Sequence, residues 1–132
     1  GDLFSIRVTD PYPSDWDDCL ERANQELEED ARPELAENVE NPENYDVVFL
    51  GYPNWWYGVP MALLSFLEDN DLSGKQVYLF CSHGTGGLAS SVDIIKDALP
   101  GGTISDHVFD CYEEDAPNSQ EEIESWLSEL GY

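Results

Sequence analysis

Basic residues are scarce in this 132-residue chain, and their scarcity argues against two classes of function. Only 5 lysines and arginines stand against 29 aspartates and glutamates, a formal net charge of -24 at pH 7. Without a basic stripe to displace counterions from phosphates, nucleic-acid binding is not expected. The same charge argues against an anionic membrane surface. The acidity favours a solvated surface, with the attraction of a basic partner as the alternative.

Long apolar runs and paired cysteines are also missing. The apolar runs are too short to span a membrane, and no signal-peptide pattern opens the chain. Three widely spaced cysteines, Cys19, Cys81 and Cys111, form neither a disulfide framework nor a zinc pattern, which indicates a cytoplasmic protein. Hydrophobic residues make up 41% of the sequence and alternate with the acids. We therefore expect one folded domain over residues 1–132 rather than disorder.

Strand-like and helix-like segments alternate along the chain. Leu3–Val8 has the pattern of a half-buried edge strand. Tyr45–Tyr52 and Gln76–Cys81 contain the continuous apolar runs of strands buried on both faces, and Thr103–Phe109 is a weaker edge strand. This order predicts an α/β fold with a parallel sheet and helices on both of its faces.

Helices are predicted between and after these strands. Ser14, with Asp17 three residues on, predicts a cap for a helix that carries Trp16, Leu20, Ala23 and Leu27 on one face. A second helix follows Pro60, and a third follows the glycine-rich turn at 84–87 and ends at Pro100. Ser119 and Glu122 form the pattern of a capping box before a final helix.

Two loops are candidate ligand sites, because open parallel sheets bind ligands beyond the carboxyl ends of their strands. The loop at 53–58 carries Trp55, Trp56 and Tyr57, a platform for stacking a flat ligand, or alternatively a hydrophobic lid or protein interface. The loop at 82–87 is rich in glycine, which lets backbone N–H groups approach a ligand. That second signal is weak by itself, since tight strand–helix turns share it.

Several enzyme classes do not match these loops. A cysteine phosphatase requires an arginine six residues after Cys81, where this chain has Gly87, and the P-loop pattern is absent. A nucleophilic pair of Cys81 and His83 is not favoured, since strand alternation is expected to separate the two side chains. His83 and His107 lack metal-ligand spacing with any cysteine or acid, so no metal site is expected.

The stretch YDVVFLGYPNWWYGVPMALLSFLEDNDLSGKQVYLFCSHGTGGLASSV closely resembles flavodoxin-like proteins, in particular the group with a Gly-Tyr-Pro-x-Trp-Trp loop. The resemblance covers nearly the whole chain and implies a flavodoxin-like three-layer sandwich, here with four strands. It also implies FMN as cofactor. The residues implied to line the flavin are Pro53, Asn54, Trp55, Trp56, Tyr57 and Gly58 in the first loop and Ser82, His83, Gly84, Thr85 and Gly86 in the second.

The chain departs from the family at its start, which corresponds to the family's second strand. By this resemblance the family's first strand, phosphate-binding loop and first helix are expected to lack a counterpart in these residues, and FMN binding by the isolated chain is then expected to be weaker by several thousandfold. Leu3–Val8 is expected either to pair directly with Val47–Leu50 or to leave an edge that recruits another chain, in a homodimer or with a partner that supplies the missing strand.

The sequence therefore favours a flavoprotein with a role in electron transfer or as an oxidoreductase, in which the cofactor carries the redox step and no side chain is a required acid, base or nucleophile. Its acidic surface suits docking to a basic redox partner. Two alternatives stay open. One is a non-enzymatic binding module that has lost its cofactor and uses the aromatic loop for protein interaction. The other is a binder of a phosphate-free flat ligand such as riboflavin or a quinone.

Overall fold

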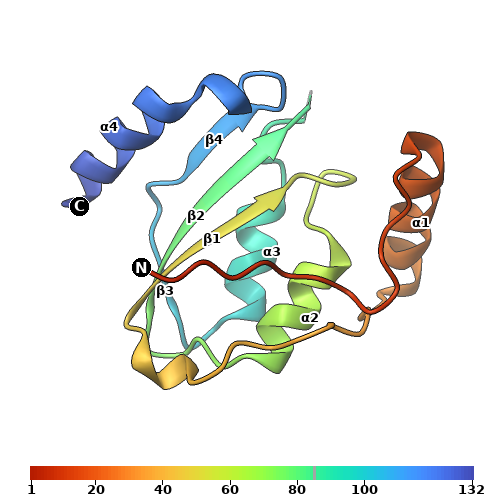
Figure 1. Cartoon of the computed structure of the whole chain (residues 1–132), viewed down its shortest axis with the longest axis horizontal. Helices are drawn as coiled ribbons and strands as arrows, with labels where there is room; N and C mark the ends of the chain where they lie inside the picture. Colours follow the sequence, from red (N-terminus) through yellow and green to blue (C-terminus); the bar gives the residue numbers. More distant parts are fainter. Residues whose placement is uncertain (85) are drawn as a thin grey trace.

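A parallel sheet organises the protein. In the computed structural model, which describes residues 1–84 and 86–132, four strands form one sheet (Figure 1). β1 (Val47–Pro53) pairs with β2 (Gln76–His83) along its whole length. β3 (Thr103–Ile104) and β4 (Phe109–Tyr112) both pair with β2 in parallel, which makes β2 the central strand. The predicted parallel sheet of four strands is confirmed, although not from the four segments expected.

Helices cover both faces of the sheet, as the alternating pattern predicted. α2 (Met61–Asp69) and α3 (Ser91–Ala98) lie on one face, against which Val77 and Leu79 are fully buried. α4 (Gln120–Leu130) lies on the other face (Figure 1). There its Trp126 contacts Phe49, with 5.9 Å between the ring centroids. The fold is thus the α/β three-layer sandwich that the sequence indicated.

The first strand expected from the sequence does not form. Leu3–Val8 makes no ladder with the sheet, and within residues 1–84 and 86–132 β1 pairs with β2 alone. Val8 instead bridges antiparallel to Leu35, and Phe4 packs on Phe66 of α2 at 5.8 Å between ring centroids. The expected direct pairing with Val47–Leu50 is therefore wrong, because the apolar side chains of this segment turn to α2 and its backbone finds partners at 34–36. Recruitment of another chain stays a prediction.

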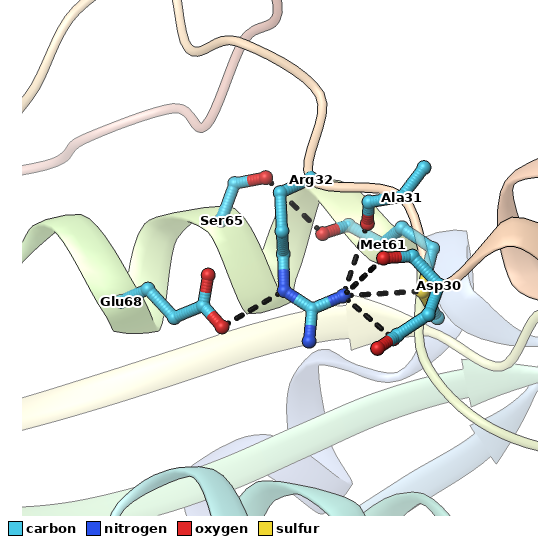
Figure 2. A network of polar contacts seen from close by, with 6 residues as sticks. All are labelled: Asp30, Ala31, Arg32, Met61, Ser65 and Glu68. Atoms are coloured by element: carbon cyan, nitrogen blue, oxygen red, sulfur yellow. Dashed lines mark hydrogen bonds and ion pairs between the residues drawn. The ribbon is translucent and has the colours of Figure 1, made fainter.

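α1 (Trp16–Glu29) stands at the outer side of α2, away from the sheet (Figure 1). Just after it, Arg32 joins the two helices through a set of polar contacts that Figure 2 shows. Its Nε lies 2.9 Å from Oε1 of Glu68 on α2, and its Nη1 lies 2.8 Å from Oδ1 of Asp30. These partners are half-exposed or exposed, so each pair contributes little to stability, about 0.5 kcal/mol. Arg32 fixes the position of the chain after α1 more than it holds the fold together.

The strand predicted at 103–109 is divided in two. β3 ends at Ile104, and β4 begins at Phe109 and runs to Tyr112, beyond the predicted end. Between them Ser105 donates its backbone N–H to the Val77 carbonyl at 2.9 Å, after which the chain leaves the sheet. The prediction of one continuous strand is wrong because the polar residues Ser105 to His107 bulge away, and β2 receives two short partners in place of one.

Both predicted helix caps differ in detail. Asp15, not Ser14, caps α1: its extended backbone places the side chain to accept from the Asp18 N–H at 3.0 Å. Ser119 stands at the N-cap of α4, but a 3-10 turn (Ala116–Asn118) precedes it and gives it ψ of 11°. Its hydroxyl therefore donates to the Ala116 carbonyl at 2.7 Å, and the predicted capping box with Glu122 does not form.

Candidate functional site

The aromatic loop after β1 is a tight turn with a strained backbone. Gly58 donates to the Trp55 carbonyl at 3.1 Å, and the two residues form an isolated antiparallel bridge. The two central residues, Trp56 and Tyr57, have φ of 52° and 62°. This left-handed conformation normally belongs to Asn and Gly in such turns, and bulky side chains adopt it at a cost of about 1–3 kcal/mol each. Strain of this kind is concentrated at functional sites.

The two tryptophans of this loop are directed toward the N-terminal region. The Trp55 ring meets the Tyr12 ring edge-on, with 5.1 Å between centroids. The Trp56 indole N–H donates to the Leu20 carbonyl of α1 at 3.2 Å, and 43% of Trp56 stays exposed. Tyr57 is 68% exposed and is the ring of this loop most available to a flat ligand.

The glycine-rich loop after β2 packs directly against the aromatic loop. Asn54 is the main link: its backbone N–H donates to the Ser82 carbonyl at 2.8 Å and its side-chain Nδ2 to the Gly87 carbonyl at 2.5 Å. Gly86 lies against the Tyr57 ring, where an added Cβ would stand 3.1 Å from the ring. The structure thus brings together the two loops that the strand-end rule singled out. Thr85, which the resemblance includes among the flavin contacts, lies outside the described residues.

One buried polar atom between the two loops has no partner among the residues that the structure describes. The side-chain Oδ1 of Asn54 is buried and accepts no hydrogen bond from any of the residues that the structure describes. A buried acceptor left unpaired costs about 1–3 kcal/mol, so such an atom suits a ligand that donates a hydrogen bond. The isoalloxazine ring of a flavin is flat and carries an imide N–H, which is the kind of donor that this oxygen lacks.

His83, the last residue of β2, is held at both ring nitrogens. Nδ1 lies 3.1 Å from the Gly84 carbonyl oxygen, and Nε2 lies 2.8 Å from Oδ2 of Asp110 on β4. The hydrogen bond to Gly84 raises the pKa of His83 most, the Asp110 contact raises it further, and partial burial opposes both. A sequence signal for Asp110 was available, because this residue directly follows the segment predicted as the strand Thr103–Phe109.

The thiol of Cys81 has low reactivity. The side chain is 2% exposed, and burial raises the pKa of its thiol to about 12, with Asp110 as the next cause. The expectation that strand alternation separates Cys81 from His83 is wrong, because residues two apart share one face of a strand. Burial and the high pKa are instead what make Cys81 a poor nucleophile.

Two cavities of about 470 Å³ each lie away from the paired loops. The first is lined mainly by Ile6, Val8, Tyr12 and Ala62, where the N-terminal segment meets α2. The second lies between α1 and the chain at 31–34, and its lining includes Arg22 and Arg32 with a larger number of carboxylates.

Comparison with known proteins identifies the family. A family model described as flavodoxin matches residues 1–130. Flavodoxin 1 of Salmonella typhimurium is 38% identical over 71 residues, which cover 51% of this chain and 38% of that protein. The chain thus spans well under half the length of that curated relative. It belongs to the flavodoxin family.

Solved structures agree on the fold. A candidate flavoprotein of Bacteroides eggerthii is 30% identical, with a TM-score of 0.77 over 100% of this chain and 82% of that one. A flavoprotein from Lactobacillus acidophilus in complex with FMN is 18% identical, with a TM-score of 0.66 over 92% of this chain and 76% of that one. Among the described residues no helix is long and apolar enough to cross a membrane.

Proposed function

We propose that this chain binds a flavin, FMN or riboflavin, across the paired loops and takes part in electron transfer. The buried Oδ1 of Asn54, which lacks a partner among the described residues, in the same loop as the exposed Tyr57 ring, is the observation that carries the proposal. A flavodoxin-family fold and a structural neighbour that holds FMN support it. The bound flavin would supply the redox chemistry, because the protein side of such a site provides binding and electrostatics.

Each part of the site has a separate role in this proposal. Tyr57 would stack on the ring, and stacking of aromatic rings contributes about 0.5–1.5 kcal/mol beyond buried area. Asn54 Oδ1 would accept a hydrogen bond from the ligand. Gly86 keeps its loop close to Tyr57, since a Cβ there would stand 3.1 Å from the ring. The charge of -24 repels a phosphate, so we expect the ring to dominate affinity and riboflavin to bind about as well as FMN.

Titration with FMN and riboflavin, followed by flavin and tryptophan fluorescence, tests binding directly. Mutual quenching with both ligands is expected, because Trp56 lies next to Tyr57 in the same turn. Tight binding of FMN with no binding of riboflavin would show that the protein contacts the phosphate. It would contradict the proposal that the flavin ring supplies most of the affinity. Failure of both to bind would favour the non-enzymatic alternative.

The variant Tyr57→Gly separates binding from stability. Glycine adopts a φ of 62° without strain, so the free energy of unfolding is expected to rise by about 1 kcal/mol. Loss of the ring is expected to weaken flavin binding about tenfold. Tyr132→Ala, which removes an exposed ring on the α4 side of the molecule, is the control and should leave flavin affinity unchanged. Weakening by both variants alike would refute a specific role for Tyr57.

A basic redox partner is the second part of the proposal. Trp16 is 68% exposed at the start of α1, beside Asp15, Asp17 and Asp18. An exposed aromatic side chain whose sequence neighbours carry carboxylates is suited to a partner that presents lysines and arginines. We expect the electron-transfer rate with a basic protein such as a cytochrome to fall steeply with added salt. A rate independent of ionic strength would contradict docking by charge.

A further inference from the structure

His83 occupies an unusual position at the junction of the two loops. It ends β2, and its backbone carbonyl accepts from the Glu113 N–H at 2.7 Å, so the peptide chain around it is fixed on the β4 side. Its side chain is 15% exposed. The glycine-rich loop that would face the flavin starts at the next residue, Gly84.

Both ring nitrogens of His83 face atoms that only accept hydrogen bonds. Nδ1 lies 3.1 Å from a backbone carbonyl oxygen, and Nε2 lies 2.8 Å from a carboxylate oxygen. A neutral imidazole has a single N–H and can satisfy one of the two, whereas the imidazolium donates to both. The geometry therefore selects the protonated ring.

The groups around His83 agree with a cation there. From the β4 side the carboxylates of Asp110 and Glu113 act on it, and both raise its pKa. Cys81 on its own strand and Cys111 on β4 have pKa values raised by burial, so both thiols stay neutral at physiological pH. Tyr112 on β4 is the register partner of His83.

We propose that protonated His83 is a positioning residue that anchors the Gly84 carbonyl and thereby couples flavin affinity to pH. The inference rests on the proposed function, since it concerns the same site. When the ring loses its proton, one of the two contacts must be lost, because Asp110 and Gly84 then compete for one N–H. The stronger contact, to the Asp110 carboxylate, retains it, and the first residue of the glycine-rich loop is released.

The sign of the pH effect follows from the raised pKa. A group that binds its proton more tightly in the folded state contributes fully below its ordinary pKa of 6.5 and loses that contribution as the pH rises through its raised value. Flavin affinity should therefore be highest in mild acid and weaken by about tenfold above the pKa of His83, the value of one charge-assisted hydrogen bond. By reciprocity, saturation with flavin should raise the pKa of His83 further.

Riboflavin is the appropriate probe, because it carries no phosphate that titrates near neutral pH. We would measure its dissociation constant from pH 5.5 to 9 for the wild-type chain, for His83→Gln and for Asp110→Asn. The wild-type constant should rise about tenfold across this range, and His83→Gln should give a flat profile. Asp110→Asn should shift the midpoint to lower pH, which a purely structural role of the pair would not do. His107→Gln is the matched control, because His107 precedes β4 and pairs with Glu129 of α4 rather than with the loops, so the profile should stay unchanged.

The pKa of His83 in the free protein, from NMR of its ring, separates the two ways in which the experiment can fail. A raised pKa together with riboflavin binding that does not change with pH would overturn the coupling and leave the proposed function standing. A pKa at or below 6.5 would overturn the imidazolium anchor. Absence of riboflavin binding at every pH would overturn the proposed function, and the coupling with it.

Discussion

Residues 1–40 and residues 47–99 both contain an apolar helix face, but they differ sharply in how much of it is buried. In the second region seven consecutive residues of α2, from Met61 to Leu67, are buried. In the first, the apolar stripe of α1 leaves Trp16 68% and Leu27 41% exposed, and only Ala23 of the helix is buried. Hydrophobic spacing determines which face of an element can be buried. Whether it is buried depends on a partner surface, which β1 and β2 provide for α2 and α3 but not for α1.

The candidate site joins these unequal regions. Its strands and the glycine-rich loop belong to the well-packed region, while its two tryptophans lie against Tyr12 and the Leu20 carbonyl in the other. Local stability differs across a protein with the density of buried contacts, so the aromatic side of the site should be the more mobile side. The comparison therefore predicts which half of the site ligand binding would order.

A pair of leucine truncations gives the largest contrast. Leu79 is fully buried on β2, so Leu79→Ala is expected to lower the free energy of unfolding by about 3 kcal/mol. Leu27→Ala makes the same chemical change on α1 and is expected to cost at most about 0.5 kcal/mol, because the side chain is 41% exposed. Urea denaturation followed by circular dichroism measures both. Equal losses would show that α1 is packed as firmly as the sheet.

Cysteine labelling sharpens the same contrast without changing the sequence. Cys19 lies partly exposed on α1, whereas Cys81 is 2% exposed on β2 with a pKa of about 12. At pH 8 iodoacetamide is expected to modify Cys19 at least about a hundredfold faster than Cys81, because the buried thiol must first become exposed and then ionise. Peptide mapping by mass spectrometry gives the two rates. In urea the rates should become equal, and equal rates in buffer would contradict the difference in packing.

The well-packed region is also the one that the sequence predicted best. Continuous apolar runs predict β1 and β2, and the rule for strand ends predicts that Asn54 and Ser82 lie at one edge, where the Asn54 N–H donates to the Ser82 carbonyl at 2.8 Å. These inferences succeed because the signal is local and the partner strand is adjacent in the sheet. The sequence does not contain an equally local signal for the contact between Tyr12 and Trp55, which are 43 positions apart and meet only because of where α1 lies.

The predictions that failed concern elements whose partners the sequence did not specify. Leu3–Val8 has the alternation of an edge strand, yet its backbone bonds run to residues 34–36 and its Phe4 packs on α2. The strand predicted at 103–109 was divided because its polar centre bulges from β2. In both cases the alternation of apolar and polar residues indicates extended backbone. Which segment it pairs with depends on tertiary structure that the alternation does not encode.

Removal of the α1 cap gives the smallest effect and the most direct test of independence between the regions. Asp15→Ala deletes the side chain that accepts from the Asp18 N–H, at an expected cost of about 1 kcal/mol to α1. Because α1 has few buried residues, we expect its amides to exchange about fivefold faster with solvent while those of α2 are unchanged. Asp17→Ala is the matched control: it removes a first-turn charge without a cap bond, and its effect should be about half as large. Faster exchange in α2 as well would mean that the two regions open as one unit. The local stability of β1 and β2 would then extend to Trp55 and Trp56 of the site.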